Sequence, residues 1–96
     1  MKKYIIYRTT NTVNNKEYTG AHSTKDLNSD KYLGSGMRLK RAIKKYGEDK
    51  FIRKILYEYD NKEETYAKEK EIVTQEYVDR PDTYNLKVGG EGGFDY

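Results

Sequence analysis

The chain has no cysteine, a single histidine, one proline and no long apolar run. Without thiols it can form neither disulfides nor thiolate metal sites, and one imidazole excludes zinc centres built from several histidines. Any metal would therefore be bound through oxygen. No segment approaches the roughly 20 consecutive apolar residues that span a bilayer, and the N-terminal apolar stretch in MKKYIIYRTT is too short for a signal peptide. We therefore expect a soluble, cytoplasmic protein with no membrane partner.

Apolar side chains are also scarce. The 96 residues are 34% hydrophobic and 36% charged, so the core must be thin. Aromatic residues make up 14% of the chain, and its eleven tyrosines supply much of the bulk that can be buried. A disordered chain would be depleted in aromatic residues and in isoleucine and valine at periodic positions. We therefore expect residues 1–96 to form a single small domain.

Charge is distributed unevenly along the chain. The formal net charge is +3, but residues 31–54 carry a net charge of +7 and residues 58–76 a net charge of −4. The basic half could hold the phosphates of a nucleic acid. The alternative is that both regions are the solvated faces of helices in a protein rich in lysine and glutamate.

The first half of the chain predicts a β-hairpin followed by a helix. Tyr4–Tyr7 favours a strand and Glu17–Thr19 a second one, because the asparagines between them tolerate the left-handed backbone of a tight reversal. Residues 21–36 show no clear period and are expected to form a loop, with at most a short helical turn. Apolar residues at helical spacing then predict a helix from about Met37 to Tyr46 with a basic solvent side.

The second half predicts a strand and another helix. Residues 51–59 have apolar side chains on both parities, as expected for the centre of a small sheet. Asn61 resembles a helix N-cap, and the helix is expected to run to about Tyr77. Residues 84–86 are then expected to return as a short segment before a flexible glycine-rich tail begins at about residue 89. The order indicates an α+β fold with a small, mainly antiparallel three-stranded sheet flanked by helices.

Glu69 occupies an unusual position in the second predicted helix. It lies three residues after Tyr66 and four before Val73, which belong to the apolar stripe of that helix. The carboxylate should therefore project from the apolar side, where a charge is costly unless it has a partner or a task. An oxygen ligand of this kind suits Mg²⁺, which keeps most of its waters and needs only one or two protein carboxylates.

The hairpin carries two triplets that resemble the signature of the GIY-YIG nuclease family. Residues 5–7, Ile-Ile-Tyr, resemble the first triplet, and residues 18–20, Tyr-Thr-Gly, resemble the second. Their tyrosines, Tyr7 and Tyr18, are eleven residues apart. Residues 39–51, LKRAIKKYGEDKF, are similar to the segment around the KYG turn in phage homing endonucleases of this family.

Two later motifs extend the resemblance from residue 4 to residue 93. Glu69 followed by Val73 resembles the metal-binding glutamate of the family and the apolar residue after it, and Tyr84-Asn85 resembles its YN element. The resemblance implies a phosphodiester hydrolase that cleaves double-stranded DNA with Mg²⁺ (or Mn²⁺). It would be the catalytic module of a homing-type endonuclease in a phage-infected or bacterial cell. A separate DNA-binding region C-terminal to this domain would fit the same resemblance.

The chain departs from the family pattern where an arginine is usual. The family places it about ten residues after the second motif tyrosine, and Asn28 stands there. The nearby candidates to replace it are His22 and Lys25, and Arg38 or Arg41 could reach the site from the basic helix. We expect Lys25, Arg38, Arg41 and Lys45 to contact DNA.

The predicted catalytic site consists of five residues: Tyr7, Tyr18, His22, Glu69 and Asn85. Glu69 would bind the metal. A phenol with an ordinary pKa of about 10 is a poor base, so the tyrosine that resembles the proposed general base of the family needs positive charge nearby, and His22 or Lys25 could supply it. Alternatively, His22 could itself be the base. Asn85 would act in the active site or bridge the backbone.

Two other function classes are compatible with these residues. A nuclease-derived module that binds nucleic acid without cutting it is suggested by the missing arginine. A structural or interaction protein would instead use the paired tyrosines for ordinary cross-strand packing. Cleavage and salt-dependent DNA binding distinguish the three classes.

Overall fold

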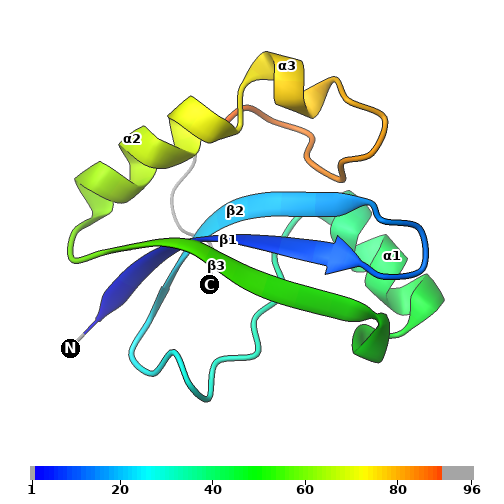
Figure 1. The fold of residues 1–96 in the computed structure, drawn as a ribbon, viewed down its shortest axis with the longest axis horizontal. Helices are drawn as coiled ribbons and strands as arrows, with labels where there is room; N and C mark the ends of the chain where they lie inside the picture. The colour runs from blue at the N-terminus through cyan, green and yellow to red at the C-terminus, as the bar shows by residue number, and fades with distance from the viewer. Residues whose placement is uncertain (1, 90–96) are drawn as a thin grey trace.

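The computed structural model describes residues 2–89 (Figure 1). Its elements follow in the order β1 (Lys3–Asn11), β2 (Glu17–Thr24), α1 (Met37–Tyr46), the 3₁₀ turn η1 (Glu48–Lys50), β3 (Phe51–Tyr59), α2 (Lys62–Ile72) and α3 (Gln75–Val78). Both strand pairs, β1 with β2 and β1 with β3, are antiparallel. The expected three-stranded α+β architecture is confirmed. Among residues 2–89, no helix has both the length and the apolar composition needed to cross a membrane.

The hairpin forms as predicted and is longer than predicted. Its turn closes through a hydrogen bond from the Asn11 N–H to the Lys16 carbonyl, at 2.8 Å. Asn15 has a φ of 63°, the left-handed conformation that asparagine tolerates. Strand β2 continues to Thr24, so the first residues of the expected 21–36 loop are strand. The rest of that loop contains no helix.

The expectation that residues 51–59 form the central strand was wrong, because the sheet order is β2-β1-β3. Strand β3 is an edge, and its Ile52 is 61% exposed. A bulge opposite Ile6 and Tyr7 shifts the register of β3 by one residue. Odd-numbered residues of β3 therefore face one side of the sheet before the bulge and the other side after it. As a result, both odd and even positions carry apolar residues although the two faces of β3 are not both buried. The strand covered on both sides is β1, where Ile5, Ile6 and Tyr7 are all buried.

Alternation along β1 gives the sheet two faces. The face carrying Tyr7 and Thr9, here called the loop face, is covered by α1 and by the 25–36 loop, and the Thr9 hydroxyl donates to the Leu33 carbonyl at 2.6 Å. The face carrying Ile6 and Arg8, here called the helix face, is covered by α2 and α3. Figure 1 shows α2 and α3 on one side of the strands and the 25–36 loop on the other.

The single helix predicted from Asn61 to Tyr77 is two helices. Asn61 caps the first as expected, because its side-chain oxygen accepts the Glu64 N–H at 2.9 Å. That helix ends at Ile72, and the Thr74 side chain then caps α3 by accepting the Tyr77 N–H. Val73 and Tyr77 are buried, as their spacing predicted, whereas Tyr66 is only partly buried.

The segment after α3 returns along the outer edge of β2. The Glu17 N–H donates to the Asp82 carbonyl at 2.9 Å, and the Tyr84 N–H donates to the Glu17 carbonyl at 2.7 Å. This confirms the expected returning segment, which covers the outer edge of β2 at Glu17. Gly89 was expected to begin the flexible tail, but it is buried and its N–H donates to the Val73 carbonyl at 2.8 Å. The rest of the predicted glycine-rich tail lies outside the described residues.

Candidate active site

The two motif tyrosines lie on the loop face of the sheet. Tyr7 of β1 pairs with Gly20 of β2, and Thr9 pairs with Tyr18, so both phenols project on the same side. Their ring centroids are 6.3 Å apart. The sequence prediction that the two tyrosines converge is consistent with this geometry.

Gly20 leaves room for the Tyr7 hydroxyl. A Cβ atom at Gly20 would lie 2.8 Å from that hydroxyl oxygen, closer than real Cβ contacts allow. Tyr7 is only 1% exposed, yet among residues 2–89 no hydrogen bond to its hydroxyl is formed. Burial raises the pKa of Tyr7 far above that of an ordinary phenol, and the charge of Glu69 adds to the effect. Tyr7 therefore stays protonated and can donate a hydrogen bond to a ligand, but it is not a proton acceptor at neutral pH.

Two glycines before α1 hold the ring of Tyr18. A Cβ at Gly36 would lie 2.6 Å from Tyr18 Cε1, and one at Gly34 would lie 3.1 Å from two other atoms of the ring. Gly34 also has a φ of 137°, which side chains of L-residues rarely adopt. The segment 34–36 thus packs its backbone against the phenol, and Gly36 is the N-cap of α1. This contact links the position of Tyr18 to the start of the basic helix.

His22 lies in the same cluster as the tyrosines. Its ring stacks on Tyr32 with centroids 4.0 Å apart and meets Tyr7 edge-on with centroids 6.4 Å apart. The Nε2 atom is 2.9 Å from Asp30 Oδ2, and His22 is only 5% exposed. We call Tyr7, Tyr18, His22 and Tyr32 the tyrosine cluster. The buried position means that His22 supports the cluster from within rather than lying on an open surface.

Arg53 of β3 ties the 25–36 loop to the sheet. Its guanidinium donates to Asp30 Oδ1 at 3.2 Å, to the Tyr32 carbonyl at 3.0 Å and to the Asp30 carbonyl at 3.1 Å. Burial alone would raise the pKa of Asp30, but hydrogen bonds from Thr24, the Tyr32 N–H and His22 outweigh it and hold the pKa well below its usual range. Asp30 is therefore a carboxylate that only accepts hydrogen bonds.

Glu69 of α2 is partly buried, as its apolar-side position predicted. A Cβ at Gly89 would lie within 2.7 Å of the Glu69 backbone and Cγ, so the chain packs directly on this residue. Although α2 covers the helix face, the Glu69 carboxylate is near enough to Tyr7, on the loop face, for its charge to raise the pKa of that phenol. Within residues 2–89, no group of three or more His, Cys, Asp or Glu side chains is arranged to hold a metal ion, so a cation at Glu69 would keep several of its waters.

Asn85 bridges the backbone of β2 between the second tyrosine and its glycine. Its side-chain oxygen accepts the Thr19 N–H at 3.0 Å, and its amide donates to the Thr19 carbonyl at 2.7 Å. Of the two roles considered for Asn85, these contacts fit the backbone-bridging one. Asn85 thereby fixes the strand that carries Tyr18 and Gly20.

The predicted DNA-contacting residues lie outside this cluster. Lys25, Arg38, Arg41 and Lys45 are all exposed. The last three are on the solvent side of α1, opposite its buried Leu39 and Ala42. Of the candidates for the missing arginine, the structure brings His22 into the cluster.

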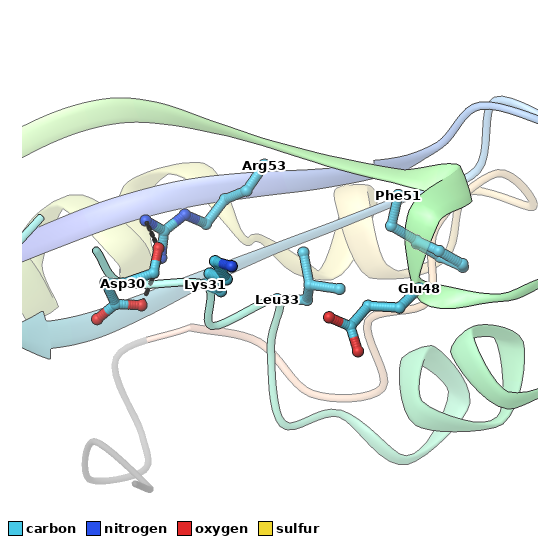
Figure 2. Close-up of a pocket in the computed structure, with 6 residues that line it drawn as sticks. All are labelled: Asp30, Lys31, Leu33, Glu48, Phe51 and Arg53. Carbon is cyan, nitrogen blue, oxygen red and sulfur yellow. Dashed lines mark hydrogen bonds and ion pairs between the residues drawn. The ribbon is translucent and has the colours of Figure 1, made fainter. Parts of the chain in front are cut away.

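A hollow of about 290 Å³ opens beside the Asp30–Arg53 pair. Figure 2 shows Arg53 reaching from β3 to Asp30 at one end of the hollow, and Glu48 and Phe51 at the other. Lys31 and Leu33 of the loop complete its lining.

The sequence analysis missed Asp30, Tyr32 and Arg53. Arg53 left a signal, because it interrupts a parity of β3 on which Phe51 and Ile55 are apolar. A charge at such a position calls for a buried partner. Nothing in the local sequence of the loop identified that partner as Asp30, which is 23 residues away.

Curated relatives of this chain come from Enterobacteria phage T4. One, named "Putative endonuclease segB", is 54% identical over 93 residues, which is 97% of this chain and 42% of the relative. "Putative endonuclease segE" is 52% identical over 90 residues (94% and 43%), and "Endonuclease segA" is 53% identical over 93 residues (96% and 42%). No protein-family model and no solved structure matches the chain. The chain is thus similar to phage proteins named endonucleases and spans less than half of their length.

Proposed function

We propose that this domain is a Mg²⁺-dependent (or Mn²⁺-dependent) endonuclease of the GIY-YIG type that hydrolyses phosphodiester bonds in double-stranded DNA. The observation that carries the proposal is the convergence of Tyr7 and Tyr18 on one face, with an unpaired Tyr7 hydroxyl within the described chain and the Glu69 charge nearby. The similarity to phage endonucleases supports the same activity.

The tyrosine cluster supplies groups that this reaction requires. Cleavage needs a positioned water, neutralisation of charge on phosphorus and stabilisation of the leaving oxygen. Tyr7 keeps its proton and would donate a hydrogen bond to the water or to a phosphate oxygen. Tyr18, which is partly exposed, would contact the attacking water, with His22 packed edge-on against Tyr7. The proton acceptor of the reaction would then be Tyr18 or His22 rather than Tyr7.

Glu69 would hold the metal ion. A single partly buried carboxylate fits Mg²⁺, because this ion keeps several of its waters and binds through one or two protein oxygens. The bound cation would polarise the phosphate and stabilise the leaving oxygen. The chain's own part would be to position the Glu69 carboxylate, and Gly89 packs against the backbone and Cγ of Glu69.

The exposed basic side of α1 would contact the DNA backbone. Arg38, Arg41 and Lys45 point away from the core, and Lys25 lies in the loop that leads toward this helix. Such contacts are independent of sequence and weaken with salt. Target choice would then come from a separate DNA-binding region C-terminal to this domain. The large part of each curated relative that this chain does not cover leaves room for such a region.

Cleavage of supercoiled plasmid DNA tests the proposal. The parent chain should produce nicked or linear DNA with Mg²⁺ or Mn²⁺, and Glu69→Gln and Tyr18→Phe should reduce that product to a residual level. Glu71→Gln is the matched control, because Glu71 lies on the same helix with an exposed side chain and pairs with Lys68 on the surface. Salt-dependent DNA binding without product at any divalent metal would favour the non-cleaving module. Absence of DNA binding at low salt would favour a structural protein.

A further inference from the structure

We propose that Asp30 is a positioning residue for His22. Its carboxylate accepts the Nε2–H of the imidazole, so that Nδ1 is the nitrogen that the neutral ring offers to the tyrosine cluster as an acceptor. The effect of Asp30 on DNA cleavage rests on the proposed function, whereas the tautomer of His22 does not.

The hydrogen bonds of Asp30 decide which partner carries the proton. Oδ1 accepts the Tyr32 N–H at 2.8 Å and an Arg53 N–H at 3.2 Å, and Oδ2 lies 2.9 Å from His22 Nε2. A carboxylate that already accepts from these donors and is ionised has no proton to give. The proton in the Asp30–His22 contact therefore belongs to Nε2. In a neutral imidazole, the other nitrogen must then be unprotonated.

Packing prevents the imidazole from turning away from Asp30. The ring stacks on Tyr32 at an interplanar angle of 13° and meets Tyr7 at 87°. The side chains of His22 and Asp30 are only 7% and 12% exposed. Exchange of the ring nitrogens would thus require the loop to move, because Tyr32 closes one face of the imidazole.

Arg53 fixes Asp30 in turn. Its guanidinium bonds the Asp30 carboxylate and also the main-chain carbonyls of Asp30 and Tyr32. Both ends of the segment from Asp30 to Tyr32 are therefore bonded to strand β3. This chain of contacts, from Arg53 through Asp30 to His22, positions the imidazole without touching the reacting atoms.

The test is the tautomer of His22, which is the only histidine of the chain, so ¹⁵N NMR of the imidazole needs no assignment. At a pH where the ring is neutral, the parent should show a protonated Nε2 and an unprotonated Nδ1. In Asp30→Asn the carboxamide can present its NH₂ group to Nε2, so the proton should move to Nδ1. Asp26→Asn is the matched control, because Asp26 lies in the same loop and its carboxylate accepts hydrogen bonds from the Asn28 N–H and the Ser29 hydroxyl. It should leave the spectrum unchanged.

Plasmid cleavage by the same variants gives the second measurement. Asp30→Asn should reduce the nicking rate roughly 10- to 100-fold, the usual effect of removing a group that orients a functional ligand, while Asp26→Asn should not. A parent spectrum with a protonated Nδ1 would overturn the proposal even if Asp30→Asn fails to fold. So would an unchanged tautomer in a folded Asp30→Asn. If the tautomer switches but the parent cleaves no DNA, the positioning role stands and the proposed nuclease function fails.

Discussion

Each face of the β1–β2 pair has a buried tyrosine, Tyr77 on the helix face and Tyr7 on the loop face. The two differ in the hydrogen bonds of their hydroxyl groups. On the helix face, the Tyr77 hydroxyl donates to Glu17 at 2.8 Å and bonds Thr19 at 2.8 Å, and Arg8 bonds both of these partners. On the loop face, the Tyr7 hydroxyl forms no hydrogen bond with any residue of the described chain. A tyrosine with satisfied bonds holds the structure together, whereas one with an unused donor at the centre of a polar cluster is suited to a ligand.

Electrostatics keeps both of these tyrosines protonated. Burial raises the pKa of Tyr77 to about 12, and the Glu17 hydrogen bond keeps the proton on the phenol. Burial also dominates at Tyr7 and raises its pKa further. Both phenols stay protonated at neutral pH. The difference between the faces is therefore what each proton is bonded to, rather than whether it is present.

Removing one hydroxyl from each face should have the largest effect and gives the most direct comparison. Tyr7→Phe should lower plasmid cleavage about 100- to 1,000-fold, as expected for loss of a positioned donor, with a change in unfolding free energy of less than about 1 kcal/mol. Tyr77→Phe should instead cost about 1–3 kcal/mol of stability, because Glu17 and Thr19 lose a buried partner. Denaturant unfolding and cleavage rates measure the two effects. Equal activity losses in both variants would abolish the distinction between the faces.

Displacing the Tyr18 ring should have the next largest effect on cleavage. In Gly36→Ala, the new Cβ would lie 2.6 Å from the Tyr18 ring, although the backbone φ of −61° suits alanine. Displacement of the phenol should reduce the cleavage rate roughly 10- to 100-fold. In a Tyr18→Phe background the same substitution should cost much less activity, because the hydroxyl is already gone. Independent, additive losses would show that Gly36 acts by another route.

Removing the Asn85 hydrogen bonds to strand β2 should lower the stability of the domain. Asn85→Ala removes two hydrogen bonds to the Thr19 backbone and should lower the free energy of unfolding by about 1–3 kcal/mol. Urea denaturation measures the change. Asn28→Ala, at an exposed loop position, is the control and should change stability by less than about 0.5 kcal/mol. A stable Asn85→Ala variant without activity would instead return Asn85 to the catalytic groups.

Protonation of Asp30 at low pH should lower the stability of the domain, and we expect this to be the smallest of the effects. The folded-state pKa of Asp30 lies below its unfolded value of about 3.9, so its contribution is present above that pH and is lost as the pH falls toward the folded value. Between about pH 5 and pH 2, the denaturant midpoint of the parent should therefore fall more than that of Asp30→Asn. Parallel curves for the two proteins would show that Asp30 does not contribute.

Local patterns predicted much of the fold. The spacing of Leu39, Ala42 and Tyr46 gave the bounds of α1, and Asn61 marked the start of α2. The pairing of Tyr7 with Tyr18 was implied by the resemblance of the hairpin to the GIY-YIG signature. In each case, the relevant interaction lies within one element or between neighbours in the sequence.

Features that depend on distant pairing were not predictable in this way. The bulge in β3 exists only relative to β1, so apolar residues on both parities suggested a central strand. The break after Ile72 preserves the apolar spacing of Val73 and Tyr77, and only the capping ability of Thr74 could have revealed it. The predicted site lacked Asp30 and Arg53 for the same reason, because their pair joins a loop to a strand 23 residues further along the chain.

Strand β1 supplies alternate side chains to both faces, Tyr7 to one and Arg8 to the other. Insertion or deletion of a single residue inside this strand would exchange the two sets, moving the arginine into the aromatic cluster and the phenol under the helices. The 12–16 turn, whose residues are all exposed, carries no such constraint. Length variation among natural homologues should therefore concentrate in that turn, while the number of residues in β1 stays constant.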